Sequence, residues 1–211
     1  NPAYELRKTQ MPRITPAVIA AARHTGATVL IPGNVYNYGA GAPTRITEET
    51  PWRPSTRKGA LRVTMETTYR AAGVRTIVVR AGDFFERERS EGWFDMMITA
   101  KSHRGKTLYP GPLDRVHAWA YLPDMARAAV MLAEKRASFA PFEEFLIEGY
   151  SITGAELVEA IAQATGKAQT VSGVPWWAMR ILGLVRPTIR EVMEMRYLWD
   201  VPHRLDSAKL A

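Results

Sequence analysis

The chain has 211 residues, 46% of them hydrophobic and 23% charged, which is typical of a globular protein and excludes a disordered or fibrous one. It has no cysteine, which excludes a disulfide framework, a thiol nucleophile and a Cys-ligated metal, and fits a reducing, cytoplasmic compartment. The net charge of +7 is spread along the chain, with no basic run interleaved with aromatic residues, so small anions are expected as partners and nucleic acid is not.

The first elements expected in the chain are a helix and a buried strand. Thr15 and Pro16 stand before an apolar run, which predicts a helix capped by Thr15, with Pro16 at its first position and Gly26 just after its end. The run ATVLIP at 27–32 is apolar throughout, as in a strand buried on both faces. Residues 33–56 then form a long loop rich in Gly, Pro and Thr, which indicates a functional or mobile segment.

A second helix–strand unit follows, with a helix over 57–72 and a strand over 75–80. Two such units in succession favour an α/β fold with a parallel, doubly wound sheet. The later elements are less regular: helices are expected over 92–104, 123–136, 153–166 and 188–200, and strands over 116–121 and 142–147. We therefore expect a sheet domain over 1–83 and a smaller α/β substrate subdomain over 84–211, with about 115–148 returning to the sheet.

Two capping boxes are expected in the last third of the chain. Thr153 with Glu156, and Thr188 with Glu191, have the Thr-x-x-Glu spacing in which both side chains satisfy backbone N–H groups at a helix start. Between them, Trp176 and Trp177 stand in an apolar segment and predict a core or subunit contact, with a substrate lid or a membrane-surface contact as the alternative. No apolar run approaches the roughly 20 residues needed to span a bilayer, so no membrane partner is expected.

Three charged residues in the helix over 57–72 stand four apart. Lys58, Arg62 and Glu66 therefore project from one face of that helix. The spacing fits a solvent-exposed ion-pair ladder, and it fits equally the wall of a site. The preceding strand ends at Asn34, and ligands of open parallel sheets bind beyond the carboxyl ends of strands, which favours the site.

The other candidate side chains are histidines and aspartates. The four histidines, at 24, 103, 117 and 203, show no metal-binding spacing, so no metal is expected, and His117 is interpreted as a satisfied, partly buried histidine. Asp124 is explained as a first-turn acid that meets the helix dipole. Asp83 ends a buried strand before Phe84 and Phe85, which together predict an acidic and aromatic lip to a cleft. Neither a GxSxG elbow nor a GxGxxG loop is present.

Five segments in order resemble a known superfamily. They are ATVLIPGNVYNYG (27–39), PSTRKGALRVTME (54–66), IVVRAGDFF (77–85), HAWAYLPDMARAAV (117–130) and LDSAKL (205–210). They are similar to the Ser-Ser-x-x-Val-Tyr-Gly, P-x-T-x-Y-G-x-x-K-x-x-x-E, L-R-P-x-N-x-Y-G-P, V-x-D-x-A-x-A and D-x-S-K segments of extended short-chain dehydrogenases/reductases, in particular the NAD-dependent epimerase/dehydratase group. The resemblance covers essentially the whole chain and implies a Rossmann-like sheet with NAD or NADP as cofactor.

The resemblance also implies a site, with departures from the usual chemistry. In that family a Tyr, its pKa lowered by a Lys four residues later, exchanges a proton with a substrate hydroxyl while NAD(P) moves hydride. Here those positions hold Lys58 and Arg62, and the family's Ser/Thr falls at Pro32. We expect Arg62 to bind the nicotinamide ribose and Lys58, with a depressed pKa, to serve as acid/base.

The remaining expected contacts follow from the same resemblance. Cofactor contacts are expected from Asn1, Pro32, Arg62, Ala81 and Gly82, and substrate contacts from Asn34, Val35, Tyr36, Asp83, Phe84 and Phe85. The family's glycine-rich half lies upstream of the segments matched here, so we expect that half to be missing from this sequence. The function expected is an atypical NAD(P)-dependent epimerase, dehydratase or reductase on a small molecule, as a possible homodimer. The alternative is a non-catalytic NAD(P)-binding module of the redox-sensing or regulatory kind.

Overall fold

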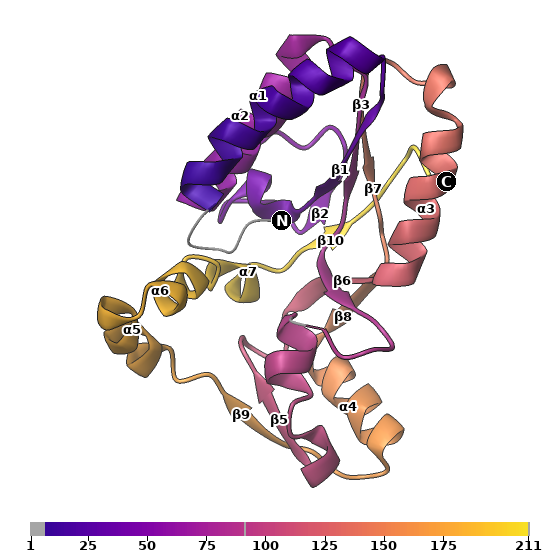
Figure 1. Ribbon diagram of the computed structural model, residues 1–211. Coiled ribbons are helices and arrows are strands. Elements are labelled where there is room, and N and C mark those ends of the chain that lie inside the picture. The colour runs from indigo at the N-terminus through magenta and orange to yellow at the C-terminus, as the bar shows by residue number, and fades with distance from the viewer. Residues whose placement is uncertain (1–6, 91, 211) are drawn as a thin grey trace.

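The computed structural model describes residues 7–90 and 92–210. A three-stranded parallel sheet organises the upper part of the molecule in Figure 1, in the order β1 (Val29–Gly33), β3 (Thr76–Arg80), β7 (Phe142–Leu146). Helices α1 (Arg7–Thr25) and α2 (Arg57–Ala72) cover one face, and α3 (Leu122–Glu134) covers the other. The expected α/β fold with parallel strands and helices on both faces is confirmed.

The central strand shows why the helices pack on both sides. All five residues of β3 are buried, and neighbouring side chains along a strand point to opposite faces. Val78 joins the cluster under α1 and α2, which includes Ile31, Met65 and Tyr69. Ile77 and Val79 instead join the cluster under α3. The continuous apolar run of β3 therefore serves two separate cores.

The first strand differs from the expectation of burial on both faces. In β1, Ile31 and Gly33 are buried, but Leu30 is 36% exposed and Pro32 is exposed. The cause is position, because within the described residues β1 is an edge strand paired with β3 alone. The core beneath α3 is built on β3 and β7, so it does not extend to Leu30.

Helix α1 also differs from the expectation, since it begins at Arg7 and contains Pro12 and Pro16. The hydroxyl of Thr15 donates to the carbonyl of Met11 at 2.9 Å, one turn back, and so does not cap a helix start. Pro16 removes one backbone donor inside the helix but does not end it. The Thr15-Pro16 pair therefore lies in a helix, as expected. The expected helix start at this pair is wrong, because the helix begins at Arg7 and continues through it.

The lower part of the molecule is made of short strands and helices. Strand β4 (Asp83–Phe85) runs parallel to β6 (Val116–Tyr121), which pairs antiparallel with β8 (Tyr150–Thr153). Two further parallel pairs are β5 (Lys106–Tyr109) with β9 (Thr170–Gly173), and β2 (Arg45–Ile46) with β10 (Arg204–Leu205). The helices are α4 (Gly154–Thr165), α5 (Trp176–Val185), α6 (Pro187–Met193) and α7 (Tyr197–Asp200). None of the helices in the described part of the chain is long and apolar enough to cross a membrane.

Two expected helices are different in the structure. The one over 92–104 is replaced by a π-helical turn, η3 (Phe94–Ile98), and a 3-10 turn, η4 (Ser102–Arg104). The one over 188–200 is split into α6 and α7, and its N-terminal cap is Arg186. The carboxylate of Glu191 binds Lys58 of α2, so it is not available for a capping box. The box of Thr153 and Glu156 is present as predicted.

The expected division of the chain at residue 83 remains a prediction. Strand β7 joins the main sheet, as expected of the segment returning to it, whereas β6 pairs with β4 and β8 beside that sheet.

Candidate functional site

A cavity of about 560 Å³ opens where the main parallel strands end. Pro32 and Gly33 of β1 line it, and so do Ala81 and Gly82, which follow β3. This is the edge at which ligands of open parallel sheets bind. The fold therefore puts a ligand-sized space at the position that the strand order favours.

Most of the residues proposed from the sequence meet at this cavity. Its lining includes Pro32, Asn34, Val35, Tyr36, Arg62, Ala81, Gly82, Asp83 and Phe84. Phe85 instead packs among the aromatic rings of Phe94, Tyr121 and Tyr150. Lys58 is not one of the lining residues within the described ranges, and Asn1 lies outside the residues that the structure describes. The roles of all these residues remain proposals.

Arg62 brings a permanent positive charge to the cavity. It projects from α2 and donates a hydrogen bond from Nη1 to the carbonyl oxygen of Pro32 at 3.2 Å. That bond joins α2 to the end of β1 and holds the guanidinium at the cavity wall. A guanidinium stays protonated at any physiological pH, so Arg62 can bind an anion or a hydroxyl but cannot exchange protons.

Lys58 is held by two carboxylates of the C-terminal helices. Its Nζ lies 2.5 Å from Oε2 of Glu191 and 3.1 Å from Oε2 of Glu194. Its backbone N–H also donates to Oε1 of Glu194 at 2.9 Å. Burial opposes the ionisation of Glu191, but the hydrogen bond and charge of Lys58 outweigh it and lower the pKa of that carboxyl. Lys58 thus fastens the segment around α6 to the start of α2.

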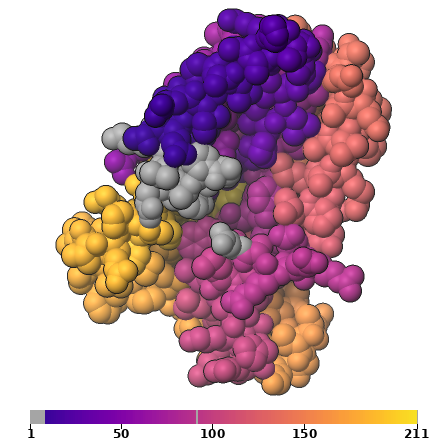
Figure 2. All heavy atoms as spheres, viewed as in Figure 1, coloured from indigo at the N-terminus to yellow at the C-terminus, as the bar shows by residue number. Residues whose placement is uncertain are grey.

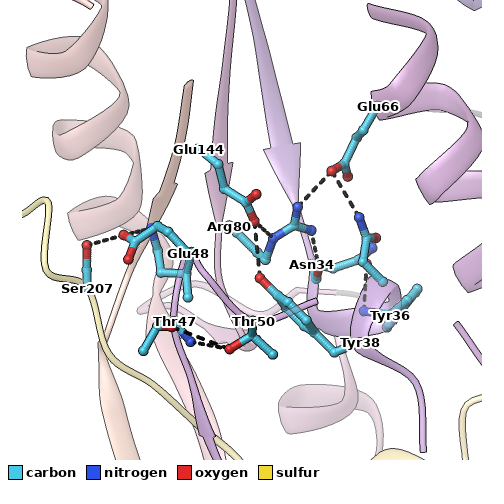
Figure 3. A network of polar contacts seen from close by, with 12 residues as sticks. Asn34, Tyr36, Tyr38, Thr47, Glu48, Thr50, Glu66, Arg80, Glu144 and Ser207 are labelled. Carbon is cyan, nitrogen blue, oxygen red and sulfur yellow. Dashed lines mark hydrogen bonds and ion pairs between the residues drawn. The ribbon is translucent and has the colours of Figure 1, made fainter. Parts of the chain in front are cut away.

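Glu66, the third member of the ladder, belongs to a buried network that Figure 3 shows. The guanidinium of Arg80 has no exposed surface, and it contacts Glu66 at 2.7 Å and Glu144 at 2.5 Å. Arg80 also donates to the carbonyl of Asn34, and the hydroxyl of Tyr38 donates to Glu144. The solvent-exposed interpretation of the ladder is therefore wrong, because Lys58 and Glu66 are buried and pair with other elements.

The network positions the loop after β1. Asn34 caps the 3-10 helix η2 (Val35–Tyr38) through its side-chain oxygen, which accepts from the N–H of Tyr36 at 3.1 Å. Its carbonyl is held by Arg80, and Asn37 donates from Nδ2 to Glu66 at 3.0 Å. A buried ion network therefore fixes the backbone of the residues that line one wall of the cavity.

Asp83 forms a carboxylate–imidazole pair at the cavity. Its Oδ2 lies 2.8 Å from Nε2 of His117, and its side chain is 22% exposed. A Cβ on Gly82 would collide with the carbonyl of Ala118, so the glycine lets the chain approach β6 closely enough for this pair to form. The ring of His117 is buried and stacks on Trp199, with centroids 4.3 Å apart and planes 4° from parallel. Asp83 therefore lines the cavity with its carboxylate bonded to His117, whose ring is held in place by Trp199.

A second buried histidine lies beside this pair. His203 lines the cavity, is 2% exposed, and meets the ring of His117 edge-on at 4.6 Å. Its Nδ1 lies 2.9 Å from the carbonyl of Val201, which can only accept, so Nδ1 carries the proton and Nε2 has a lone pair. Within the described residues that Nε2 has no hydrogen-bond partner. Burial first, and then the neighbouring His117, lower the pKa of His203 to about 4, so the ring is neutral near pH 7.

Most of the rest of the lining is apolar and comes from the segment around η3 and from the C-terminal helices. The side chains are Trp93, Met96, Met97, Met179, Val192, Met195 and Leu198. Trp176 is packed near this wall and donates from Nε1 to the carbonyl of Pro110 at 2.8 Å, while Trp177 is 73% exposed. Figure 2 shows the segment of α5 and α6 projecting from the left of the molecule. One of the two tryptophans is therefore a packing residue and the other is on the surface.

Sequence reasoning did not find His117, His203 or the apolar wall as parts of one site. His117 and Asp83 lie on strands that only β-pairing brings together, and His203 reaches them through a backbone bond from its N–H to the carbonyl of Val116. A signal was available for His117 alone, since alternation along β6 puts it on the same face as Trp119.

Comparisons with known proteins agree with this architecture. The family model described as "NAD dependent epimerase/dehydratase family" matches residues 8–147. A search of the curated proteins gives no match.

Three of the similar solved structures show how far the likeness extends. MoeE5 in complex with UDP-glucose and NAD has a TM-score of 0.72 at 17% identity, over 99% of this chain and 68% of that one. The L-threonine 3-dehydrogenase from Trypanosoma brucei has a TM-score of 0.66 at 18% identity, over 95% and 64%. The dTDP-glucose 4,6-dehydratase from Bacillus anthracis, in complex with NAD, has a TM-score of 0.65 at 21% identity, over 76% and 53%.

These matches define the fold and the family. The chain spans between about half and two thirds of the length of the three structures, and at these identities the likeness shows a shared fold. The expectation of a missing upstream half remains a prediction, since the family match itself begins at residue 8. With the family model covering most of the chain, the protein belongs to the NAD dependent epimerase/dehydratase family.

Proposed function

We propose that this chain acts as an NAD(P)-dependent epimerase, dehydratase or reductase on a hydroxyl or carbonyl group of a small molecule. One observation carries the proposal: a fixed cation, Arg62, and a cavity-facing carboxylate, Asp83, line the same cavity at the carboxyl ends of β1 and β3. The first can bind a cofactor, and the second can exchange a proton with a substrate. Oxidation of an alcohol requires both a hydride acceptor and a proton acceptor within reach of one carbon–oxygen bond.

The residues present fit the nicotinamide end of such a cofactor. Arg62 and the backbone at Pro32, Gly33, Ala81 and Gly82 would hold the nicotinamide ribose, since they bring a cation and peptide groups to one wall of the cavity. When bound, NAD(P) supplies or accepts a hydride. The sequence shown has no GxGxxG loop, so the described residues offer contacts to the nicotinamide side and no diphosphate cradle.

Asp83 is the acid/base that the geometry supports best. Its carboxylate lines the cavity, and the buried ring of His117 holds one carboxylate oxygen from behind. In the oxidative direction the substrate hydroxyl gives its proton to Asp83 as its carbon loses a hydride. His117 acts as a positioning residue, since it touches Asp83 and is itself 3% exposed. A carboxylate fixed in this way can act repeatedly at one substrate atom.

The role proposed for Lys58 has less support from its surroundings. Its ammonium would have to leave two carboxylates before it could reach a substrate. The same contacts favour the second candidate function, a non-catalytic NAD(P)-binding module. At the position of the family's catalytic Tyr this chain has a lysine held in ion pairs, which cannot exchange a proton with a substrate while those pairs persist. The two functions share a cofactor and differ in turnover.

A two-step experiment separates them. The purified full-length protein is titrated with NADH and with NADPH, following the fluorescence of the reduced nicotinamide. It is then mixed with a panel of nucleotide sugars and small ketones, following cofactor absorbance. The enzyme proposal predicts saturable cofactor binding and turnover with at least one member of the panel. Binding without any turnover would favour the sensing module, and absence of cofactor binding would contradict both. Sedimentation of the same sample tests the expected homodimer.

A further inference from the structure

The apolar part of the cavity lining consists of side chains from three separate segments. Trp93, Met96 and Met97 come from the segment around η3, Met179 comes from α5, and Val192, Met195 and Leu198 come from α6, α7 and the link between them. Four of the nine methionines in the chain lie in this lining. Methionine provides a flexible, polarizable surface that adapts to flat or irregular apolar ligands. This wall offers dispersion contacts and almost no hydrogen bonds to a ligand.

The cavity lining has few positive charges for the binding of a phosphate-bearing ligand. Within the described residues, Arg62 is the one Lys or Arg side chain that lines it. Asp83 adds a carboxylate, which repels an anion. His203 is buried with the proton on Nδ1, and among the residues that the structure describes its Nε2 is an acceptor without a hydrogen-bond partner. Binding a diphosphate takes several charge-assisted contacts, and in the described lining Arg62 is the single cation, which the cofactor also needs, while Asn34 and Tyr36 add neutral polar groups.

We propose that the substrate is an uncharged molecule with an apolar, ring-sized body and one hydroxyl or carbonyl, and that it is not a nucleotide sugar. The apolar body lies against the methionine and tryptophan wall, and its oxygen lies at Asp83. In the reductive direction a bound NAD(P)H would supply the hydride for the carbonyl carbon, and Asp83 would give a proton to the carbonyl oxygen, so that the products would be an alcohol and NAD(P)+. This inference rests on the proposed function, and it departs from the UDP-sugar ligands held by a structure of similar fold.

Two of the methionines that line the cavity can be replaced to test this proposal. Met179 is half-buried on α5, and Met96 is 63% exposed. Replacing either by Gln keeps the length of the side chain but puts an amide where an apolar ligand would make contact. Met131 is 57% exposed on α3, whose buried face packs on the main sheet, and it provides a matched control.

The test compares two probes on the full-length protein. Isothermal titration calorimetry measures the dissociation constants of 2-decalone, an uncharged bicyclic ketone, and of UDP-glucose, each with and without NADH or NADPH. We expect 2-decalone to bind at least about tenfold more tightly than UDP-glucose. Met179→Gln is expected to weaken 2-decalone binding by about tenfold, because a thioether contact is replaced by a desolvated amide. Met131→Gln is expected to leave both constants unchanged.

The outcomes separate this inference from the proposed function. Tighter binding of UDP-glucose, no binding of 2-decalone, or equal effects of Met179→Gln and Met131→Gln would each overturn the substrate class. If 2-decalone binds as expected but neither cofactor does, the substrate class stands and the NAD(P)-dependent function falls. If Met179→Gln does not fold, as judged by circular dichroism, Met96→Gln replaces it, because that side chain is largely exposed and has little effect on packing.

Discussion

Two clusters, each of which pairs acidic with basic side chains, differ in their burial and in how fully their polar atoms are hydrogen-bonded. The first cluster consists of Arg80, Glu66 and Glu144, and its arginine is fully buried. Tyr38 and Asn37 add hydrogen bonds to its two carboxylates. Asp83 and His117 form the other, in which the carboxylate is partly exposed and faces the cavity. The difference shows that charge alone does not identify a reactive group.

What separates the clusters is how fully each charge is already bound. Every nitrogen of the Arg80 guanidinium has a partner, so a substrate would have to displace protein contacts to reach it. Within residues 7–90 and 92–210, Asp83 has one hydrogen-bond partner, His117, on one of its two carboxylate oxygens, and it lines the cavity. A saturated buried network stabilises and positions a loop, whereas a half-satisfied carboxylate at a cavity can take part in chemistry.

The largest effect on stability is expected from the buried cluster. Arg80→Met leaves two carboxylates in the core without their cation, and it should lower the free energy of unfolding by about 3–5 kcal/mol. Urea unfolding followed by circular dichroism measures this. Arg45→Met, which removes an exposed ion pair with Asp206, is the control and should leave the midpoint nearly unchanged. Similar midpoints for both variants would contradict the structural role of Arg80.

A smaller effect should come from the pH dependence of stability. Burial lowers the pKa of His203 to about 4, below its ordinary value of 6.5, so between these values the unfolded chain binds a proton that the folded chain does not. Stability should therefore fall as the pH drops from about 6.5 to 4, by on the order of 3 kcal/mol. His203→Met should flatten this slope. His24→Gln, which alters an exposed ring, should retain it, and a slope common to wild type and His203→Met would exclude the account.

Much of the fold could be predicted from sequence because local signals and burial agreed. The apolar run of β3, the capping box at Thr153 and the parallel sheet all follow from patterns within a few residues. The errors arose where distant contacts override local preference. Glu191 has a capping-box spacing but binds Lys58, and the exposed face of β1 depends on which helix covers it.

The candidate site divides in the same way. Asn34, Arg62 and Asp83 could be placed near a cavity from strand ends and from the family resemblance. His117 and His203 could not, because their distance from Asp83 in the chain is large and only the pairing of β4 with β6 and the packing of the C-terminal segment bring them in. The ion-pair partners of Lys58 could likewise not be predicted from the sequence, since Glu191 and Glu194 lie more than half the chain away.

We propose Asp83, and not the ion-paired Lys58, as the residue that exchanges the substrate proton. The most direct test compares kcat of Asp83→Asn and Lys58→Met with that of the wild type, using whichever panel substrate is turned over, after each variant is shown to fold and bind NAD(P)H. We predict that Asp83→Asn lowers kcat by about 10²–10⁴ with little change in stability, while Lys58→Met retains turnover and loses stability. Wild-type turnover in Asp83→Asn, together with loss of turnover in a folded Lys58→Met protein, would assign the proton exchange to Lys58 instead.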